Sequence, residues 1–237
     1  MLSSTLASAV AAALLFVSSA PAAASASRIE PRAGNLTCGS PLVVSALTQI
    51  ANNASISLTP PSNSTGSKRP AAFQTAKDSQ GRLELSTSVN GVAASTTPTF
   101  EFVPCQSKFL LSGSQSYEQF TGQPINYTYG ILRPSGHPSK CVTATSLATD
   151  GKNYPLVSAP CTTVDSVETL APQWWSIYYN ATSSKGMKYF LYFEGNTSQP
   201  GLWHLKNVAS GKNRLVEVNF QTQFNGIEPY ILSLTGR

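Results

Sequence analysis

Short stretches of alternating or clustered apolar residues, separated by turn-forming residues, follow one another along this chain from Cys38 onward. Apolar residues at helical spacing are almost absent. Alternation over four to eight residues is typical of a β-strand with one buried face. A dozen or so short strands with turns between them predict an all-β barrel or sandwich. We expect strands near residues 43–44, 56–58, 83–86, 100–103, 108–111, 127–132, 141–144, 156–159, 174–178, 189–193, 202–205, 215–219 and 230–234.

A weak internal repeat is visible among these strands. Three of them place two large apolar residues on one face, with a single residue between the two. Three such units at unequal spacings indicate threefold pseudo-symmetry with loop insertions. The pairs are Phe100 and Phe102, Trp175 and Ile177, and Leu232 and Leu234.

Composition narrows the class of protein. Only 11% of the residues are charged, and Ser, Thr, Asn and Gly replace them, which is common in secreted β proteins. The net charge of +5 is scattered, with Lys68-Arg69 as the only adjacent basic pair, so we expect no nucleic-acid partner. The length fits one β-rich domain, expected at residues 38–237.

The first residues read as a secretory signal peptide. An apolar run at residues 6–17 is followed by Pro21 and by the small-x-small sequence Ala24-Ser25-Ala26. About 12 strongly apolar residues are too few for a membrane span of roughly 20 residues. We expect cleavage after residue 26, a short N-terminal segment at 27–37, secretion to the extracellular space and no membrane span.

Export places the four cysteines in an oxidising compartment. Their even number and the absence of a C-x-x-C motif favour two disulfides over a zinc site, and no metal or other cofactor is expected. Three pairings are open. Pairing the nearest neighbours, Cys141 with Cys161, leaves Cys38 for Cys105.

N-glycosylation sequons agree with export. Glycans occupy exposed loops or strand ends, so each modified position predicts an exposed segment. The sequons are Asn35, Asn53, Asn63, Asn126, Asn180 and Asn196.

The region 129–178 resembles one lobe of the ricin B-type lectins, whose fold is a β-trefoil of three lobes. The resemblance rests on spaced cysteines, an Asp-Gly turn and a Gln-x-Trp sequence, and it implies the Cys141–Cys161 pairing. It covers about a quarter of the chain. The matching residues are Gly130-Ile131, Lys140-Cys141-Val142, Asp150-Gly151, Leu156, Cys161, Gln173-Trp174-Trp175 and Ile177. The expected fold is therefore a ricin B-like β-trefoil with long loop insertions.

Residues of the Gln-x-Trp motif have separate expected roles. The resemblance implies that Gln173 holds the lobe together through hydrogen bonds. Trp175 and Ile177 alternate with Ser176 and should face the core together. Trp174 points to the other face, where it either stacks on a sugar ring or fills the interface with the next lobe.

The resemblance also places the family's sugar contacts, and none of them is present here. An Asp, a polar residue, a stacking aromatic and an Asn are replaced by Thr143, Val157, Ala159 and Pro172. Without a charged acceptor and a ring, this lobe should not bind sugar at the usual site. Candidate ligand contacts elsewhere are Asp150, Tyr154 and Trp174.

Enzyme chemistry finds little support in the sequence. Neither the G-x-S-x-G motif nor the H-x-x-x-H motif occurs. His137 lies in a loop, and His204 alternates with apolar neighbours and should face solvent. Three glutamates on expected strands raise the possibility of a glycosidase pair, but isolated exposed glutamates are commoner. These are Glu101, Glu194 and Glu217.

The expected function is that of a secreted, glycosylated binding module without catalysis, with glycans or an extracellular protein as partner. Carbohydrate is the expected ligand class. A β-trefoil protease inhibitor is an alternative, acting through an exposed loop at 59–70 or 113–124, each of which contains proline. A surface or matrix glycoprotein without a specific ligand is another. The oligomeric state and the ligand's identity are left open.

Overall fold

The computed structural model describes residues 33–42, 54–61, 64–88, 99–118, 124–179, 189–210, 213–222 and 230–235. The expected signal peptide at 1–26 and the expected strand at 43–44 lie outside these residues. Residues 33–237 form one compact unit. This unit begins before Cys38, because Gly34 and Asn35 pair with Asp165 and Val164.

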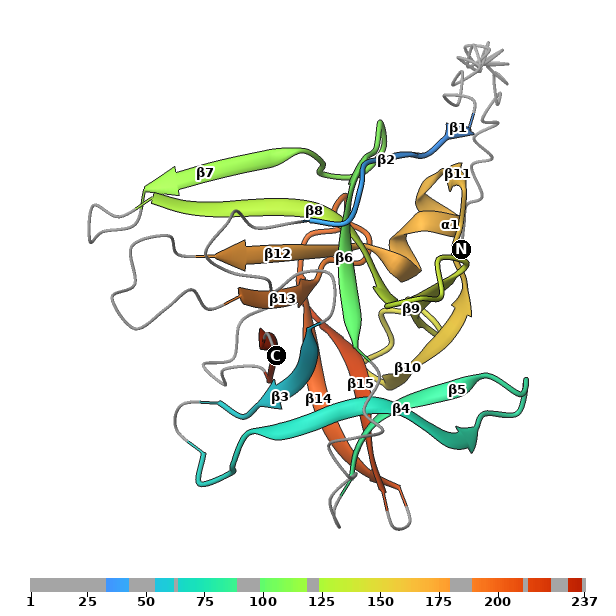
Figure 1. Ribbon diagram of the computed structural model, residues 1–237, viewed down its shortest axis with the longest axis vertical. Coiled ribbons are helices and arrows are strands. Elements are labelled where there is room, and N and C mark those ends of the chain that lie inside the picture. Colours follow the sequence, from blue (N-terminus) through green and yellow to red (C-terminus); the bar gives the residue numbers. More distant parts are fainter. Residues whose placement is uncertain are drawn as a thin grey trace, which may run out of the picture. The chain divides into compact units, whose positions relative to one another are not determined.

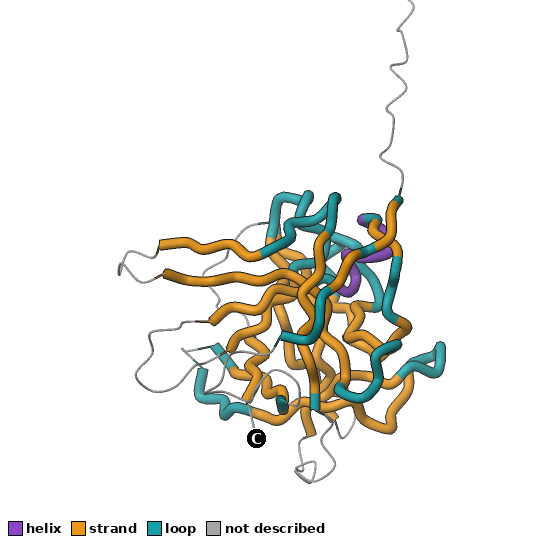
Figure 2. The backbone as a smooth tube through the Cα atoms, turned by 45° about the horizontal axis from the view of Figure 1, so that its top comes forward, coloured by secondary structure: helices purple, strands orange, loops and turns teal. Residues whose placement is uncertain are grey.

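Strands make up nearly all of the regular secondary structure in the described chain, which confirms the all-β prediction (Figures 1 and 2). One short helix, α1 (Val167–Leu170), runs into a 3-10 turn at Ala171–Gln173. The strands are β1 (Gly34–Asn35), β2 (Thr37–Cys38), β3 (Ser55–Thr59), β4 (Arg69–Lys77), β5 (Leu83–Ser88), β6 (Phe100–Gln106), β7 (Ser114–Glu118), β8 (Pro124–Pro134), β9 (Lys140–Ala144), β10 (Asn153–Pro160), β11 (Val164–Asp165), β12 (Trp175–Tyr179), β13 (Tyr189–Phe193), β14 (Leu202–Ser210), β15 (Asn213–Gln221) and β16 (Ile231–Thr235).

Six strands close into a ring. Antiparallel pairing runs from β6 through β8, β12, β13 and β16 to β3. A single bridge between Ala54 and Phe100 then joins β3 to β6. Every ring strand therefore has a neighbour on both sides, which leaves no long open edge on these strands.

Three hairpins complete a threefold arrangement. They are β4–β5, β9–β10 and β14–β15, and each is inserted between two strands of the ring. Strands β5, β10 and β15 also pair with one another, so the hairpins meet in a triangle. Twelve of the described strands thus form three successive four-strand units, in each of which the two middle strands pair as a hairpin and the first strand contacts the last. Strands β1, β2, β7 and β11 lie outside these units.

The repeat of apolar pairs marks the last ring strand of each unit. Phe100 and Phe102 lie on β6, Trp175 and Ile177 on β12, and Leu232 and Leu234 on β16. All six side chains are buried in the same hydrophobic cluster. Because side chains alternate between the two faces of a strand, these three strands each place two apolar side chains in the same core cluster.

Gly130 shows how closely two ring strands approach. It lies on β8, opposite Pro104 on one side and Trp175 on the other. A Cβ atom at this position would lie 2.0 Å from the carbonyl oxygen of Val103. Only glycine allows the backbones to pack at this distance.

Two disulfides join Cys38 to Cys105 and Cys141 to Cys161, the pairing that the sequence predicts. The first attaches β2 to the end of β6. The second links β9 to the residue that follows β10. Each bond therefore fixes a strand end that hydrogen bonding alone would leave free to fray.

Some predicted elements are wrong. The strand predicted at 108–111 is absent, and residues 107–113 instead form a bend, called here the 107–113 bend, in which the Ser107 hydroxyl accepts the N–H groups of Phe109 and Leu110. The strand predicted at 100–103 is longer than expected, since β6 continues through Pro104 to Gln106. The inhibitor loop predicted at 113–124 is instead occupied at Ser114–Glu118 by β7, which pairs with β8.

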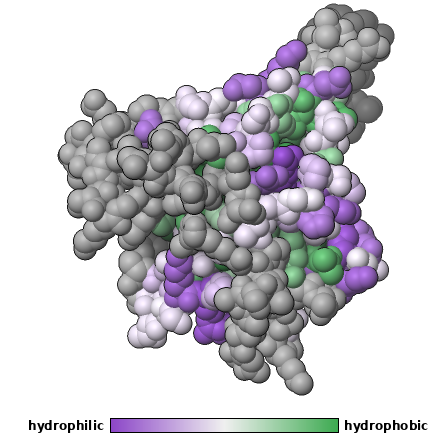
Figure 3. All heavy atoms as spheres, in the orientation of Figure 1, coloured by the Kyte–Doolittle hydropathy of each residue, from purple (hydrophilic) through white to green (hydrophobic). Residues whose placement is uncertain are grey.

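The surface of the described residues is mainly hydrophilic in the view of Figure 3, with small hydrophobic areas. Leu111, Val164 and Leu202 are the large apolar side chains exposed among these residues. The described segments include no helix long and apolar enough to cross a membrane.

Candidate functional site

Aromatic side chains line the outward face of three neighbouring ring strands, β8, β12 and β13. Tyr127, Tyr178 and Phe190 lie side by side across these strands. The ring centroids of Tyr127 and Tyr178 are 5.5 Å apart, and those of Tyr178 and Phe190 are 5.7 Å apart and stacked. All three are half-buried, so part of each ring is accessible.

The carboxyl group of Glu194 lies beside the next outward-facing residues of β12 and β13. Ser176 on β12 pairs with Tyr192 on β13, and the Ser176 hydroxyl donates to Oε1 of Glu194. Burial raises the pKa of Glu194, and the hydrogen bond from Ser176 offsets this only in part. Burial also raises the pKa of Tyr192 to about 12, with the nearby Tyr127, Tyr178 and Glu194 adding to the shift. Both groups therefore hold their protons more strongly than in water.

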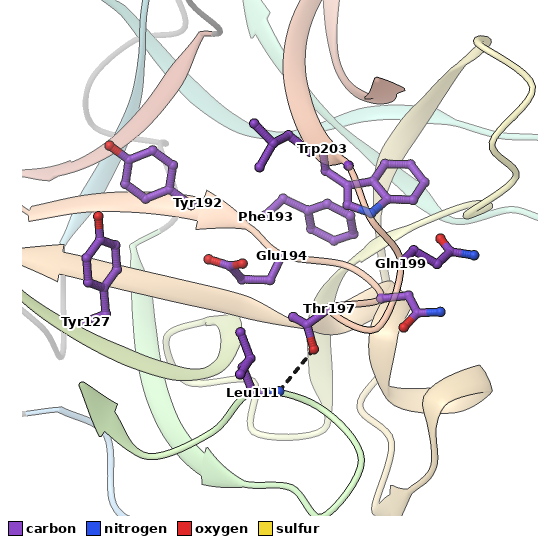
Figure 4. A pocket seen from close by; sticks show the side chains of 11 residues that line it. Leu111, Tyr127, Tyr192, Phe193, Glu194, Thr197, Gln199 and Trp203 are labelled. Atoms are coloured by element: carbon purple, nitrogen blue, oxygen red, sulfur yellow. Dashed lines mark hydrogen bonds between the residues drawn. The ribbon is translucent and has the colours of Figure 1, made fainter. Parts of the chain in front are cut away.

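Tyr192 and Glu194 line a cavity of about 360 Å³, drawn in Figure 4. Its walls combine aromatic and apolar side chains with a few polar groups, the composition typical of small-ligand sites. The Glu194 carboxyl is drawn between the tyrosines and the turn that carries Thr197 and Gln199. The remaining lining residues are Leu111, Tyr127, Phe193, Asn196, Gly201, Leu202 and Trp203.

Trp203 forms part of the cavity wall, but its indole N–H is buried inside the protein. Its side chain is 9% exposed, and among the described residues its Nε1 has no hydrogen-bond partner. The ring packs edge-on against Phe193 and lies directly over Gly195, where a Cβ atom would come within 2.4 Å of Nε1. A buried N–H without an acceptor is costly, and this one is not open to a ligand in the cavity.

Trp174 does not line the cavity but hydrogen-bonds to two residues that do, Leu111 and Glu194. Its side chain is fully buried, and its Nε1 donates to the carbonyl of Leu111 at 2.8 Å. Its own carbonyl accepts the N–H of Glu194 at 3.0 Å. The burial of Trp174 against Leu111 favours the second of its two expected roles, in which the ring fills an interface.

Asp150 and Tyr154 lie together, but away from this cavity, at the turn of the β9–β10 hairpin. The Tyr154 hydroxyl donates to Asp150 at 2.8 Å, and the Lys152 ammonium lies 3.0 Å from the same carboxylate. These contacts, Lys152 first, lower the pKa of Asp150 to about 2. Tyr154 packs against the central cluster, whereas Trp174 belongs to the second hydrophobic cluster. The three candidate ligand contacts are therefore not brought into one site.

The positions where the resemblance places sugar contacts are filled. Thr143 and Val157 face each other in the β9–β10 hairpin, and both are buried. The Thr143 hydroxyl donates to the carbonyl of Cys141 at 3.2 Å. Ala159 is also buried, and Pro172 is half-buried. These four positions accordingly offer neither a carboxylate nor an aromatic ring.

The Gln-x-Trp motif is a structural tie. The Gln173 amide donates to the carbonyl of Pro160 at 2.8 Å and accepts the N–H of Thr162 at 3.0 Å. It thus spans both sides of Cys161. The Trp175 indole donates to the carbonyl of Val142 at 3.2 Å. The motif therefore fastens the β9–β10 hairpin to the ring strand β12.

The cavity is not lined by His204, Glu101 or Glu217. His204 is 3% exposed, so the expectation that it faces solvent is wrong. It pairs with Asn219, whose side chain bonds the carbonyl of Gly151 at 2.7 Å, so the hairpins cover this face. Glu101 forms an ion pair with Arg133. Burial, with the neighbouring Glu84, raises the pKa of Glu217. The described residues include no cluster of three metal-ligating side chains.

A second cavity, of about 350 Å³, lies beside the first and shares Asn196 and Gln199 with it. Its other walls are Leu147, Val167, Glu168, Ala171 and Pro172. The turn at 195–201 therefore separates the two cavities.

Three sequons fall on described residues. Asn35 lies on β1 and is exposed, Asn126 lies on β8, and Asn196 lies in the turn after β13. Asn53, Asn63 and Asn180 lie outside the described residues.

Sequence reasoning missed Tyr127, Tyr192 and Trp203 as cavity residues and named Glu194 only as an isolated strand carboxylate. The available signal was the alternation Tyr189-Phe190-Leu191-Tyr192-Phe193, which puts aromatic residues on both faces of one strand. No protein-family model matches the chain, and the search of curated proteins gives no significant match.

Proposed function

We propose that the chain is a secreted β-trefoil of ricin B-like type that binds carbohydrate. The fold proposal is supported by the six-strand ring, the three mutually paired hairpins and the three four-strand units. In a trefoil each lobe contributes two ring strands and one hairpin. In the second unit, the Gln173 hydrogen bond and the Cys141–Cys161 bond lie where a ricin B-type lobe has its Gln-x-Trp glutamine and its pair of cysteines.

Secretion and glycosylation belong to the same proposal. Two disulfides and no free cysteine among the described residues fit an oxidising compartment. The sequons and the apolar N-terminal run point to the same route.

The observation that carries the binding proposal is the cavity beneath Tyr127 and Tyr192. Sugar rings present apolar faces that stack on aromatic side chains, and their hydroxyl and carbonyl groups need hydrogen-bond partners. The cavity offers both kinds of contact. Glu194 supplies a carboxyl group, and the exposed Gln199 side chain supplies an amide donor and acceptor. This site differs from the one that the resemblance places near Thr143.

A glycan array followed by calorimetry tests the proposal. We expect Tyr192→Ala and Glu194→Gln each to lower the affinity for an array-positive sugar about tenfold, equal to about 1.4 kcal/mol. Tyr154→Ala removes a tyrosine outside the cavity and should leave the affinity unchanged. Equal loss in Tyr154→Ala, or binding that survives both cavity variants, would place the ligand elsewhere.

Protease inhibition is the second candidate. Residues 64–68 are exposed between β3 and β4, and the Ser64 N–H and hydroxyl both donate to the carbonyl of Pro61 at 3.0 Å. An exposed loop fixed by a turn suits a protease cleft. A protease panel with the 64–68 residues replaced by glycine and serine tests it, and inhibition that persists in that variant excludes the loop.

A further inference from the structure

Asn196 stands on the rim shared by the two cavities. It is one of the two residues, with Gln199, that line both of them. It also begins the sequon Asn196-Thr197-Ser198. Any group attached to its side chain is therefore tethered at the mouth of the proposed sugar site.

The local backbone presents this asparagine for modification. Its Oδ1 accepts the N–H of Ser198 at 3.0 Å, and its carbonyl accepts the N–H of Gln199 at 3.2 Å. The hydroxyl of Thr197 accepts the N–H of Leu111 at 3.0 Å, which anchors the turn to the 107–113 bend. With Oδ1 held by this Asx turn, Nδ2 is the atom left for reaction, and Ser198 is exposed beside it.

We infer that Asn196 carries an N-linked glycan whose 2-acetamido sugars occupy the adjoining cavity, so that the protein's own glycan is a tethered ligand of the sugar site. In the modification, Nδ2 attacks the anomeric carbon of a lipid pyrophosphate-linked oligosaccharide. A C–N bond forms, the bond to the pyrophosphate oxygen breaks, the lipid pyrophosphate leaves, and Nδ2 loses one proton to base. The inference rests on the proposed function, because it uses the same cavity.

The chemistry of this ligand class matches the cavity. The first sugars of an N-linked glycan bear acetamido groups, and an acetamido carbonyl is an acceptor for the Gln199 amide or the Tyr192 hydroxyl, both of which line the cavity. The acetamido methyl and the sugar face are apolar and suit Tyr192 and Phe193.

Tethering gives the attached glycan an advantage over free sugar. A short tether corresponds to an effective concentration in the millimolar range. For a tethered concentration of about 10 mM and a dissociation constant of about 1 mM, the apparent affinity for free sugar falls about tenfold. The glycosylated protein should therefore bind free sugar poorly at a cavity that is otherwise competent.

The experiment uses full-length protein secreted from a eukaryotic host. Ser198→Ala removes the sequon and keeps the Asn196 side chain. Ser198→Thr changes the same position but keeps the sequon. Thr37→Ala is the matched control, since it removes the exposed Asn35 sequon in the same way. Peptide mapping gives glycan occupancy, and calorimetry with N,N′-diacetylchitobiose gives affinity.

We expect an occupied Asn196 in wild type, about tenfold tighter binding in Ser198→Ala, and wild-type affinity in Ser198→Thr and Thr37→Ala. An unoccupied Asn196 overturns the inference. An occupied Asn196 with equal affinity in all four proteins also overturns it and leaves carbohydrate binding intact. Absence of sugar binding on the array and in calorimetry by every form, including Ser198→Ala, overturns the proposed function and the inference together.

Discussion

Replacing Trp175 by alanine should remove the largest single contribution to the core of the second unit. The side chain is fully buried, it packs edge-on against Phe193 with centroids 5.1 Å apart, and its indole donates to Val142. A buried tryptophan removes about 200 Å² from water, equal to about 5 kcal/mol at 25 cal/mol per Å². Allowing for the alanine that remains and for partial collapse, we expect a loss of about 4 kcal/mol in the free energy of unfolding.

Urea titration of the oxidised protein, followed by circular dichroism, measures this loss as a lower midpoint at unchanged slope. Trp175→Phe keeps a ring and loses the hydrogen bond to Val142, so it should lose only about 1–2 kcal/mol. If Trp175→Ala is not secreted, the Trp175→Phe value still tests the reasoning. A loss below about 1 kcal/mol in Trp175→Ala would refute the assignment of Trp175 to the core.

Three further changes test other parts of the structure. Gly130→Ala should abolish secretion of folded protein, because its Cβ meets the Val103 carbonyl, whereas Gly34→Ala meets no atom within 4 Å and should be secreted normally; equal yields would contradict this. Burial raises the pKa of Glu194 in the folded protein, so ionising this carboxyl destabilises the wild type as the pH rises above 4.5. The melting temperature of Glu194→Gln should therefore increase relative to that of wild type over this range. A difference in melting temperature that is constant from pH 4 to 8 would exclude a raised pKa. Asp165→Asn should lose about 2 kcal/mol by thermal unfolding, since the buried carboxylate accepts a hydroxyl at 2.6 Å and an N–H at 2.9 Å; an unchanged melting temperature would show that these bonds are replaceable.

Strands were predictable where one face is buried. The alternation in 100–103, 189–193 and 215–219 arises because successive side chains point to opposite faces, and each segment is a strand in the structure. The order in which they pair is a property of the whole chain and leaves no local pattern. The strand β4 escaped notice because Pro70 and its small neighbours Ala71 and Ala72 break the usual strand composition.

The candidate site was predictable only in part, for a related reason. Alternation correctly turns Trp174 and His204 away from the central core, but it does not say what lies on the other side. A bend at 107–113 covers Trp174, and packing between hairpins covers His204. The cavity likewise needs walls from Leu111, β13 and the turn before β14, which meet only in the folded chain.

Closure of the ring through β3 and β16 has a consequence for how the chain is made. The Ser233 hydroxyl donates to the carbonyl of Ser57, 176 positions earlier. Closing that loop costs about 2 kcal/mol more entropy than closing the 20-position loop of Cys141–Cys161. At about 5–20 residues per second, β3 is synthesised roughly 10–35 s before its partner. The edge of β3 that pairs with β16 therefore stays unpaired throughout that interval. The second unit, whose strands are close in sequence and carry their own disulfide, is the part of the nascent chain able to fold first.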